Sequence, residues 1–156
     1  MRCAVLASAV LLAACGSSEK SATIGGSTFS TDESKGTASI TTDKGTIRTA
    51  EGEAAAKVEM PAYAPRYPGA TVTGVIETDA EGSKHKMVTL STPDAIGKVA
   101  DFYKASLTKA GWKIPASFIS GDGGMLSGQK DGKEVSIAIS RDEDAKTNLV
   151  VTFPNI

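Results

Sequence analysis

The stretch TPDAIGKVADFYKASLTKAG, from Thr92 to Gly111, decides the fold that we expect. Its apolar side chains recur at every third or fourth position, the spacing that gathers them on one face of an α-helix. They are Ile96, Val99, Tyr103, Leu107 and Ala110, with Ala95 and Phe102 beside them. The opposite face carries charged side chains, so the pattern predicts a surface helix that lies on a sheet.

The residues at both ends of this stretch are typical helix boundaries. Thr92 can cap the N-terminus, Pro93 suits the first turn, and Asp94 complements the positive end of the helix dipole. Gly111 follows the last apolar position and can adopt the left-handed conformation that ends a helix. We therefore expect the helix to begin at Pro93 and to end just before Gly111.

The segments on either side of this helix alternate between apolar and polar residues, as strands do. Two candidate strands precede the helix and four follow it: 72–78, 86–91, 112–120, 125–130, 134–140 and 147–153. The alternation is cleanest in 134–140, and Pro115 interrupts the first strand after the helix. The predicted fold class is α+β: an antiparallel sheet of about six strands in the order β-β-α-β-β-β-β, with one main helix on one face.

A small β-rich segment, residues 23–60, is expected to precede this sheet. Residues 37–42 and 46–49 alternate around the turn Asp43-Lys44-Gly45, which predicts a β-hairpin. Its large apolar residues are few: Ile24, Phe29, Ile40 and Ile47. So small an apolar surface cannot support an independent domain. We expect the segment to dock on the domain that follows, the alternative being that it stays mobile.

The opening of the chain has the features of an export signal. Arg2 supplies positive charge, residues 4–13 are almost entirely apolar, and Cys15 follows two alanines. The stretch Leu12-Ala13-Ala14-Cys15 resembles the lipobox of bacterial lipoproteins. A buried helix and an ordinary cleaved signal are the alternatives. The abrupt change to polar residues after Gly16 argues against the first, and the place of Leu12 relative to Cys15 argues against the second.

This resemblance implies a cellular location and a membrane anchor. It implies a signal peptide over residues 1–14, a tether over 15–22, and Cys15 as the first mature residue, carrying acyl chains such as palmitate. The predicted partner is a membrane, and the predicted location is the cell envelope. Gly16 follows the cysteine. In a bacterium with two membranes, a glycine at this position resembles the signal for the outer membrane, where the protein would face the periplasm.

A second resemblance covers residues 61–156, which we expect to form the main α+β domain. Tyr67-Pro68-Gly69-Ala70, Phe102-Tyr103 and Gly111-Trp112 are similar to motifs of uncharacterised envelope lipoprotein domains. These residues indicate packing. Tyr67 and Pro68 would turn the chain into the first strand, Phe102 or Tyr103 would fill the seam between helix and sheet, and Trp112 would close its end. The resemblance implies no activity.

Composition disfavours several classes of function. Seventeen basic and eighteen acidic side chains give a formal charge of −1, so the chain has no excess of positive charge that would attract nucleic acid. The two cysteines, Cys3 and Cys15, lie in the opening stretch and leave no disulfide for the folded part. The single histidine, His85, lies between two lysines and is expected to be solvated. We therefore predict no metal site, no cofactor and no catalytic residues.

Two further motifs have ordinary explanations. The run Gly121-Asp122-Gly123-Gly124 lacks the Gly-Lys-Ser/Thr ending of a phosphate loop and is interpreted as a hairpin turn. The acidic run 142–144 lacks the spacing of an EF-hand and is interpreted as a solvated turn.

The function expected first is that of a non-catalytic, lipid-anchored envelope protein. It would contact another envelope protein or component through an exposed sheet face or edge. The alternative is a binding module for a small apolar or glycan ligand held between helix and sheet, with Trp112, Tyr103 and Phe118 as candidate contacts. An enzymatic function has the least support, because no nucleophile with a neighbouring base can be recognised in the sequence.

Overall fold

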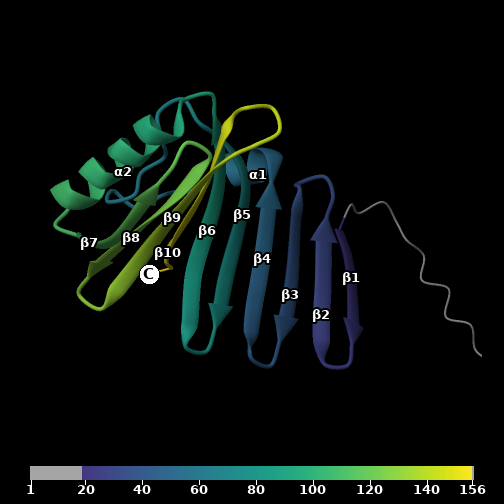
Figure 1. Cartoon of the computed structure of the whole chain (residues 1–156). Helices are drawn as coiled ribbons and strands as arrows, with labels where there is room; N and C mark the ends of the chain where they lie inside the picture. Colours follow the sequence, from purple (N-terminus) through teal and green to yellow (C-terminus); the bar gives the residue numbers. More distant parts are fainter. Residues whose placement is uncertain (1–18, 156) are drawn as a thin grey trace, which may run out of the picture.

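The computed structural model describes residues 19–155, so the predicted lipobox and Cys15 lie outside the described part of the chain (Figure 1). The elements of the first half are β1 (Glu19–Ile24), β2 (Ser27–Asp32), β3 (Thr37–Thr42), β4 (Gly45–Glu51), α1 (Gly52–Ala56), β5 (Thr71–Ala80) and β6 (Ser83–Thr92). Those of the second half are α2 (Ile96–Lys109), β7 (Lys113–Ile119), β8 (Gly123–Lys130), β9 (Lys133–Arg141) and β10 (Thr147–Pro154).

All of these strands belong to one antiparallel sheet, in the order β1-β2-β3-β4-β5-β6-β10-β9-β8-β7. The chain runs along the sheet from β1 to β6, crosses over through α2 to the far edge at β7, and returns strand by strand to β10 beside β6 (Figure 1). The prediction of about six strands with one main helix was therefore wrong. Within residues 19–155 the structure has ten strands and two helices.

The error came from residues 23–60, which extend the same sheet with further strands, whereas a small hairpin segment docked on the main domain was expected. β1 and β2 add two strands before the predicted hairpin, and β4 pairs with β5 from Gly45 opposite Ala80 to Glu51 opposite Gly74. Most side chains of β1–β4 are Ser, Thr or Ala. A strand added to an existing sheet edge is held by backbone hydrogen bonds, so it needs little apolar surface of its own.

The main helix was predicted at the right place but begins later than expected. α2 starts at Ile96, because Ala95 is still extended, with φ −67° and ψ 147°. The Asp94 backbone N–H donates to Thr92 Oγ1 at 3.3 Å, and Thr147 Oγ1 donates to the Asp94 carbonyl at 2.6 Å. These bonds hold residues 93–95 as a loop between β6 and α2. Gly111 ends the helical region with φ +77°, as predicted.

The core lies between α2 and the sheet. Register places Val75, Val88, Val151, Ile137 and Leu126 in one row across β5, β6, β10, β9 and β8. The apolar face of α2 covers the second half of this sheet, and its buried residues are Ile96, Val99, Ala100, Tyr103 and Leu107. We call this side of the sheet the helix-bearing face.

The rest of the helix-bearing face is partly uncovered. α1 packs on β5 and β4, but no helix of the described part lies over β1–β3. The other side, which we call the open face, carries Ile40, Ile47 and Ile76, because side chains alternate along each strand. Neither helix in residues 19–155 is long and apolar enough to cross a membrane.

Candidate functional site

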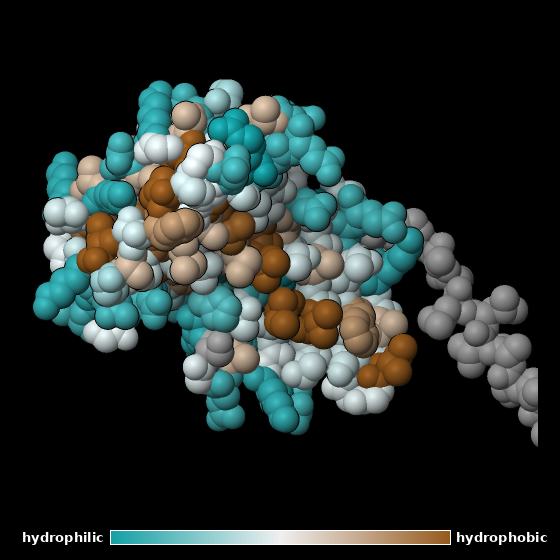
Figure 2. Space-filling view, viewed as in Figure 1, coloured by the Kyte–Doolittle hydropathy of each residue, from teal (hydrophilic) through white to brown (hydrophobic). Residues whose placement is uncertain are grey.

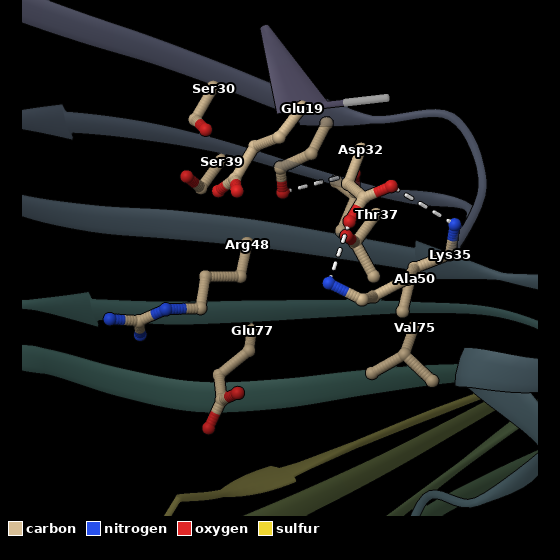
Figure 3. A pocket seen from close by; sticks show the side chains of 12 residues that line it. Glu19, Ser30, Asp32, Lys35, Thr37, Ser39, Arg48, Ala50, Val75 and Glu77 are labelled. Atoms are coloured by element: carbon tan, nitrogen blue, oxygen red, sulfur yellow. Dashed lines mark hydrogen bonds and ion pairs between the residues drawn. The ribbon is translucent and has the colours of Figure 1, made fainter. Parts of the chain in front are cut away.

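An open concavity of about 380 Å³ lies on the helix-bearing face of β1–β5, beyond the two helices (Figure 3). Ser30, Ser39, Arg48 and Glu77 stand opposite one another on β2, β3, β4 and β5, so their side chains form one row across its floor. Val75 and Ala50 border this row where the concavity meets the core. The concavity thus continues the core outward as a polar surface.

One end of the concavity is closed by the loop between β2 and β3. Asp32 is only 7% exposed, and its carboxylate accepts hydrogen bonds from the backbone N–H groups of Ser34 and Lys35 at 3.1 and 3.3 Å. Lys35 Nζ lies 2.7 Å from Asp32 Oδ2. The hydrogen bond and charge of Asp32 raise the pKa of Lys35 above its ordinary value. Asp32 therefore shapes this loop, and its charge is balanced by Lys35.

Arg48 and Glu77, side by side on the floor, differ in their partners. Asn155 Nδ2 donates to Glu77 Oε1, and Lys86 Nζ lies 3.8 Å from the same oxygen. Within residues 19–155, the guanidinium of Arg48 makes no hydrogen bond or ion pair. The hydroxyls of Ser30 and Ser39 also have no partner among the described residues. A planar cation and two hydroxyls therefore remain available on the floor of the concavity.

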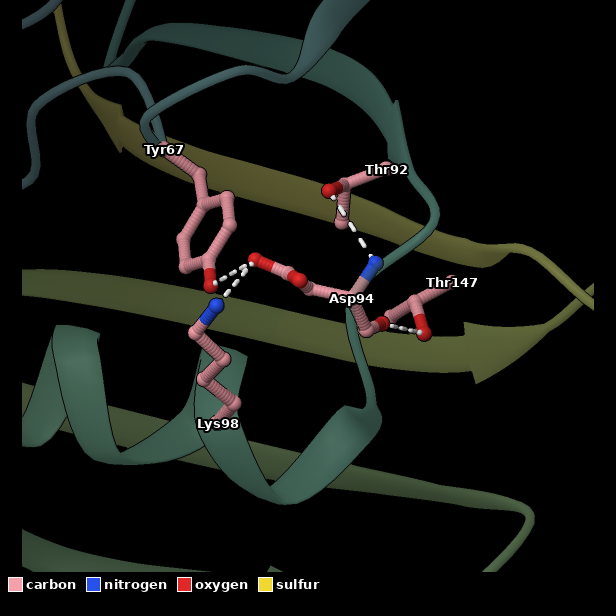
Figure 4. Close-up of polar contacts among 5 residues, drawn as sticks. All are labelled: Tyr67, Thr92, Asp94, Lys98 and Thr147. Carbon is pink, nitrogen blue, oxygen red and sulfur yellow. Dashed lines mark hydrogen bonds and ion pairs between the residues drawn. The ribbon is translucent and has the colours of Figure 1, made fainter.

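A separate polar cluster fixes the start of α2 (Figure 4). Tyr67 Oη donates to Asp94 Oδ2 at 2.7 Å, and Lys98 Nζ donates to the same oxygen at 2.9 Å. Burial, together with the bond to Asp94, raises the pKa of Tyr67 to about 12. The hydrogen bonds from Lys98 and Tyr67 lower the pKa of Asp94. The cluster joins the connector before β5 to α2, which is a structural role.

The structure does not bring the three predicted ligand contacts together. Tyr103 is fully buried in the seam between α2 and the sheet, and Trp112 is 7% exposed at its end. Phe118 is 70% exposed and lies on the open face, on the other side of the sheet. The predicted packing roles of Tyr103 and Trp112 agree with these positions.

Sequence reasoning missed Tyr63, whose ring stacks on Trp112 with 4.4 Å between centroids. Tyr63, Trp112 and Phe102 line a second, open groove of about 580 Å³ beside α2. The Tyr63 hydroxyl is buried there and makes no hydrogen bond to any residue that the structure describes. The position of Tyr63 between Pro61 and Pro65 gave no periodic signal that could have pointed to this contact.

The remaining motifs lie at turns or on a strand. Gly121 and Asp122 connect β7 to β8, which confirms the hairpin turn. Asp142 to Asp144 lie between β9 and β10, where the Asp142 carboxylate accepts a bond from the Lys146 N–H at 2.8 Å. His85 is half-buried on β6. Among the described residues, no group of three or more His, Cys, Asp or Glu side chains could hold a metal ion.

Comparison with known proteins gives one match. A family model described as START domain-like matches residues 72–146, which run from β5 to the loop before β10. The matched region contains α2 and most of the strands that it covers, and it leaves out β1–β4. It spans slightly less than half of the chain. No curated protein and no solved structure matches the chain.

Proposed function

We propose that this protein is a non-catalytic module that binds a small, hydroxyl-bearing ligand with an anionic group in the concavity of β1–β5. The START domain-like match over residues 72–146 supports a binding function over a catalytic one, and of the strands around the concavity it includes only β5. The observation that carries the proposal is Arg48, a guanidinium that has no partner within residues 19–155 and lies on the floor of a concave polar surface. We place the ligand in this concavity and not in the seam between helix and sheet, where the sequence predicted a ligand, because core side chains fill that seam.

The chemistry of the floor favours an anion. A guanidinium presents N–H donors in a fixed plane that matches a carboxylate or a phosphate. Three carboxylates line the concavity, those of Glu19, Asp32 and Glu77. Lys35 pairs with Asp32 and also lies in the field of Glu19, and Lys86 lies near Glu77. Arg48 is therefore able to pair with a ligand, and Ser30 and Ser39 can bond to hydroxyl groups beside its anionic end.

Titration with a matched pair of sugars tests this proposal. We expect glucuronate to shift the amide NMR signals of β3–β5, and glucose, which lacks the carboxylate, to shift them at least tenfold more weakly. Arg48→Gln should abolish the response to glucuronate. Arg141→Gln, a control at the end of β9, should preserve it. Equal responses to both sugars, or an unchanged response in Arg48→Gln, would contradict the proposal.

We also propose that the protein is anchored to a membrane of the cell envelope by acyl chains on Cys15. The support is the stretch Leu12-Ala13-Ala14-Cys15 after an apolar run, the pattern of a lipoprotein signal. Two or three acyl chains hold a protein at a membrane far longer than one. Contact with another envelope protein stays a prediction.

Metabolic labelling tests the anchor. Labelled palmitate should be incorporated into the wild-type protein and should be absent from Cys15→Ala, which should accumulate as a precursor or as soluble protein. Cys3→Ala is the matched control, because this cysteine precedes the apolar run and should not matter. Palmitate that persists on Cys15→Ala would exclude Cys15 as the lipidated residue.

A further inference from the structure

The open face of the sheet carries the exposed apolar side chains of the molecule. Seven large apolar side chains stay exposed among the described residues, and register places all of them on this face. They are Ile24, Phe29, Ile40, Ile47, Ile76, Phe118 and Met125. Contiguous exposed apolar surface on a folded protein marks a site of contact with a protein or a membrane.

Five of these side chains lie together on the open face of β1–β5, and we call them the open-face row: Phe29, Ile40 and Ile47 form its centre, and Ile24 and Ile76 lie diagonally beside its two ends. Phe29, Ile40 and Ile47 stand directly opposite one another on β2, β3 and β4. Hydrophobic residues are visible across this part of the molecule in Figure 2. The charged residues of β1–β5 on this face are Lys20 and Glu51, which lie at its margins. The centre of the row is therefore apolar or neutral.

The proposed anchor lies close to this row in the sequence. Cys15 is four residues before Glu19, where β1 begins. Four residues can span at most about 14 Å when fully extended. Because β1 is an edge strand of the sheet, acyl chains on Cys15 would hold the Glu19 end of this edge within that distance of the lipid surface. The proposed anchor would therefore place the open-face row near a membrane.

We propose that the open-face row lies against the surface of the lipid bilayer to which Cys15 is anchored. This inference rests on the anchor proposed above. A second copy of the chain is a poorer occupant, because five exposed apolar side chains form only a small apolar centre for an interface of about 20–30 residues on each side. With the row on the membrane, the concavity with Arg48, on the opposite face of the same strands, is turned toward the aqueous phase.

Depth-sensitive fluorescence on tethered protein tests this orientation. A chain that begins at Cys15 keeps every described contact, since these lie within residues 19–155. Its only thiol can be coupled to maleimide lipid in phosphatidylcholine vesicles, with or without bromine on the acyl chains. The probe is Ile40→Trp, and the matched control is Ser39→Trp, one residue away on the opposite face. The buried Trp112 provides a common background.

We expect brominated lipid to quench the emission of Ile40→Trp at least twofold more than that of Ser39→Trp. A second pair, Phe29→Trp and Thr28→Trp on β2, should behave in the same way and covers the case in which one variant misfolds. Equal quenching within both pairs, or stronger quenching of Ser39→Trp, would overturn the inference. If the tryptophan of Ile40→Trp is shielded from water but is not quenched by brominated lipid, at a density where the chain dimerises, the open-face row would contact a second copy.

This experiment separates the orientation from the anchor. The lipid is attached chemically, so the quenching result does not depend on whether cells acylate Cys15. Palmitate labelling of Cys15→Ala tests acylation alone. Equal quenching in both pairs would contradict the proposed orientation of the open face and would leave the proposed anchor unaffected.

Discussion

At the scale of single residues, three tyrosine hydroxyls are buried near α2, and two of them, those of Tyr67 and Tyr63, make different contributions to stability. Tyr67 Oη donates to the carboxylate of Asp94, which also holds Lys98. Tyr63 Oη is buried and has no hydrogen-bond partner in the described part of the chain. A hydrogen bond to a charged group stabilises a fold more than a neutral one, whereas a buried polar group without a bond is a cost.

The Tyr67→Phe variant should therefore lose about 1–2 kcal/mol of unfolding free energy, because Asp94 loses a donor and the ring stays in place. Tyr63→Phe is the matched control and should be neutral or slightly stabilising, because only an unsatisfied hydroxyl is removed. Urea denaturation of both variants measures the difference. Equal losses in the two variants would show that the bond between Tyr67 and Asp94 contributes nothing specific.

At the scale of elements, the extension of the sheet depends on the pairing of β4 with β5. Gly45, at the start of β4, has φ +144°, and a methyl group there would lie 2.8 Å from Ala80 Cβ and closer still to the backbone of β5. Gly97, in the first turn of α2, has open space around it and an ordinary helical backbone. We therefore expect substitution by alanine to have opposite effects on stability at these two glycines.

Gly45→Ala should destabilise the protein by about 1–3 kcal/mol, since the added methyl group overpacks the junction and meets an unfavourable φ. Gly97→Ala should stabilise it by about 0.5–1 kcal/mol, because alanine is the better helix former. Thermal unfolding measures both shifts. A Gly45→Ala protein as stable as the wild type would mean that β4 does not pack against β5 as described.

Elements with a strong periodic pattern could be predicted from the sequence, and the others could not. The face of α2 and the hairpin of β3 and β4 follow from apolar spacing and from the turn at Lys44. β1 and β2 carry mostly Ser, Thr and Ala, so no apolar alternation distinguished them from a tether or a loop. The concavity was also hidden, because only strand register brings Ser30, Ser39 and Arg48 into one row.

At the scale of the whole molecule, the two halves of the sheet differ in what lies on their faces. Its second half supports α2 and encloses the core, while its first half extends outward with a polar concavity on one side and the open-face row on the other. In the account proposed here, the concavity binds the ligand and the open-face row faces the membrane. Both proposals depend on the strands that the START domain-like match leaves out, together with β5.

The most direct test of ligand binding is the pattern of nuclear Overhauser effects between glucuronate and the protein. Ring protons of bound glucuronate should show contacts with the side-chain protons of Ser30, Ser39 and Arg48, and these should disappear in Arg48→Gln. Contacts with Tyr63 and Trp112 instead would place the ligand in the groove beside α2. That result, or the absence of contacts at the concavity at saturating sugar, would contradict the proposed site.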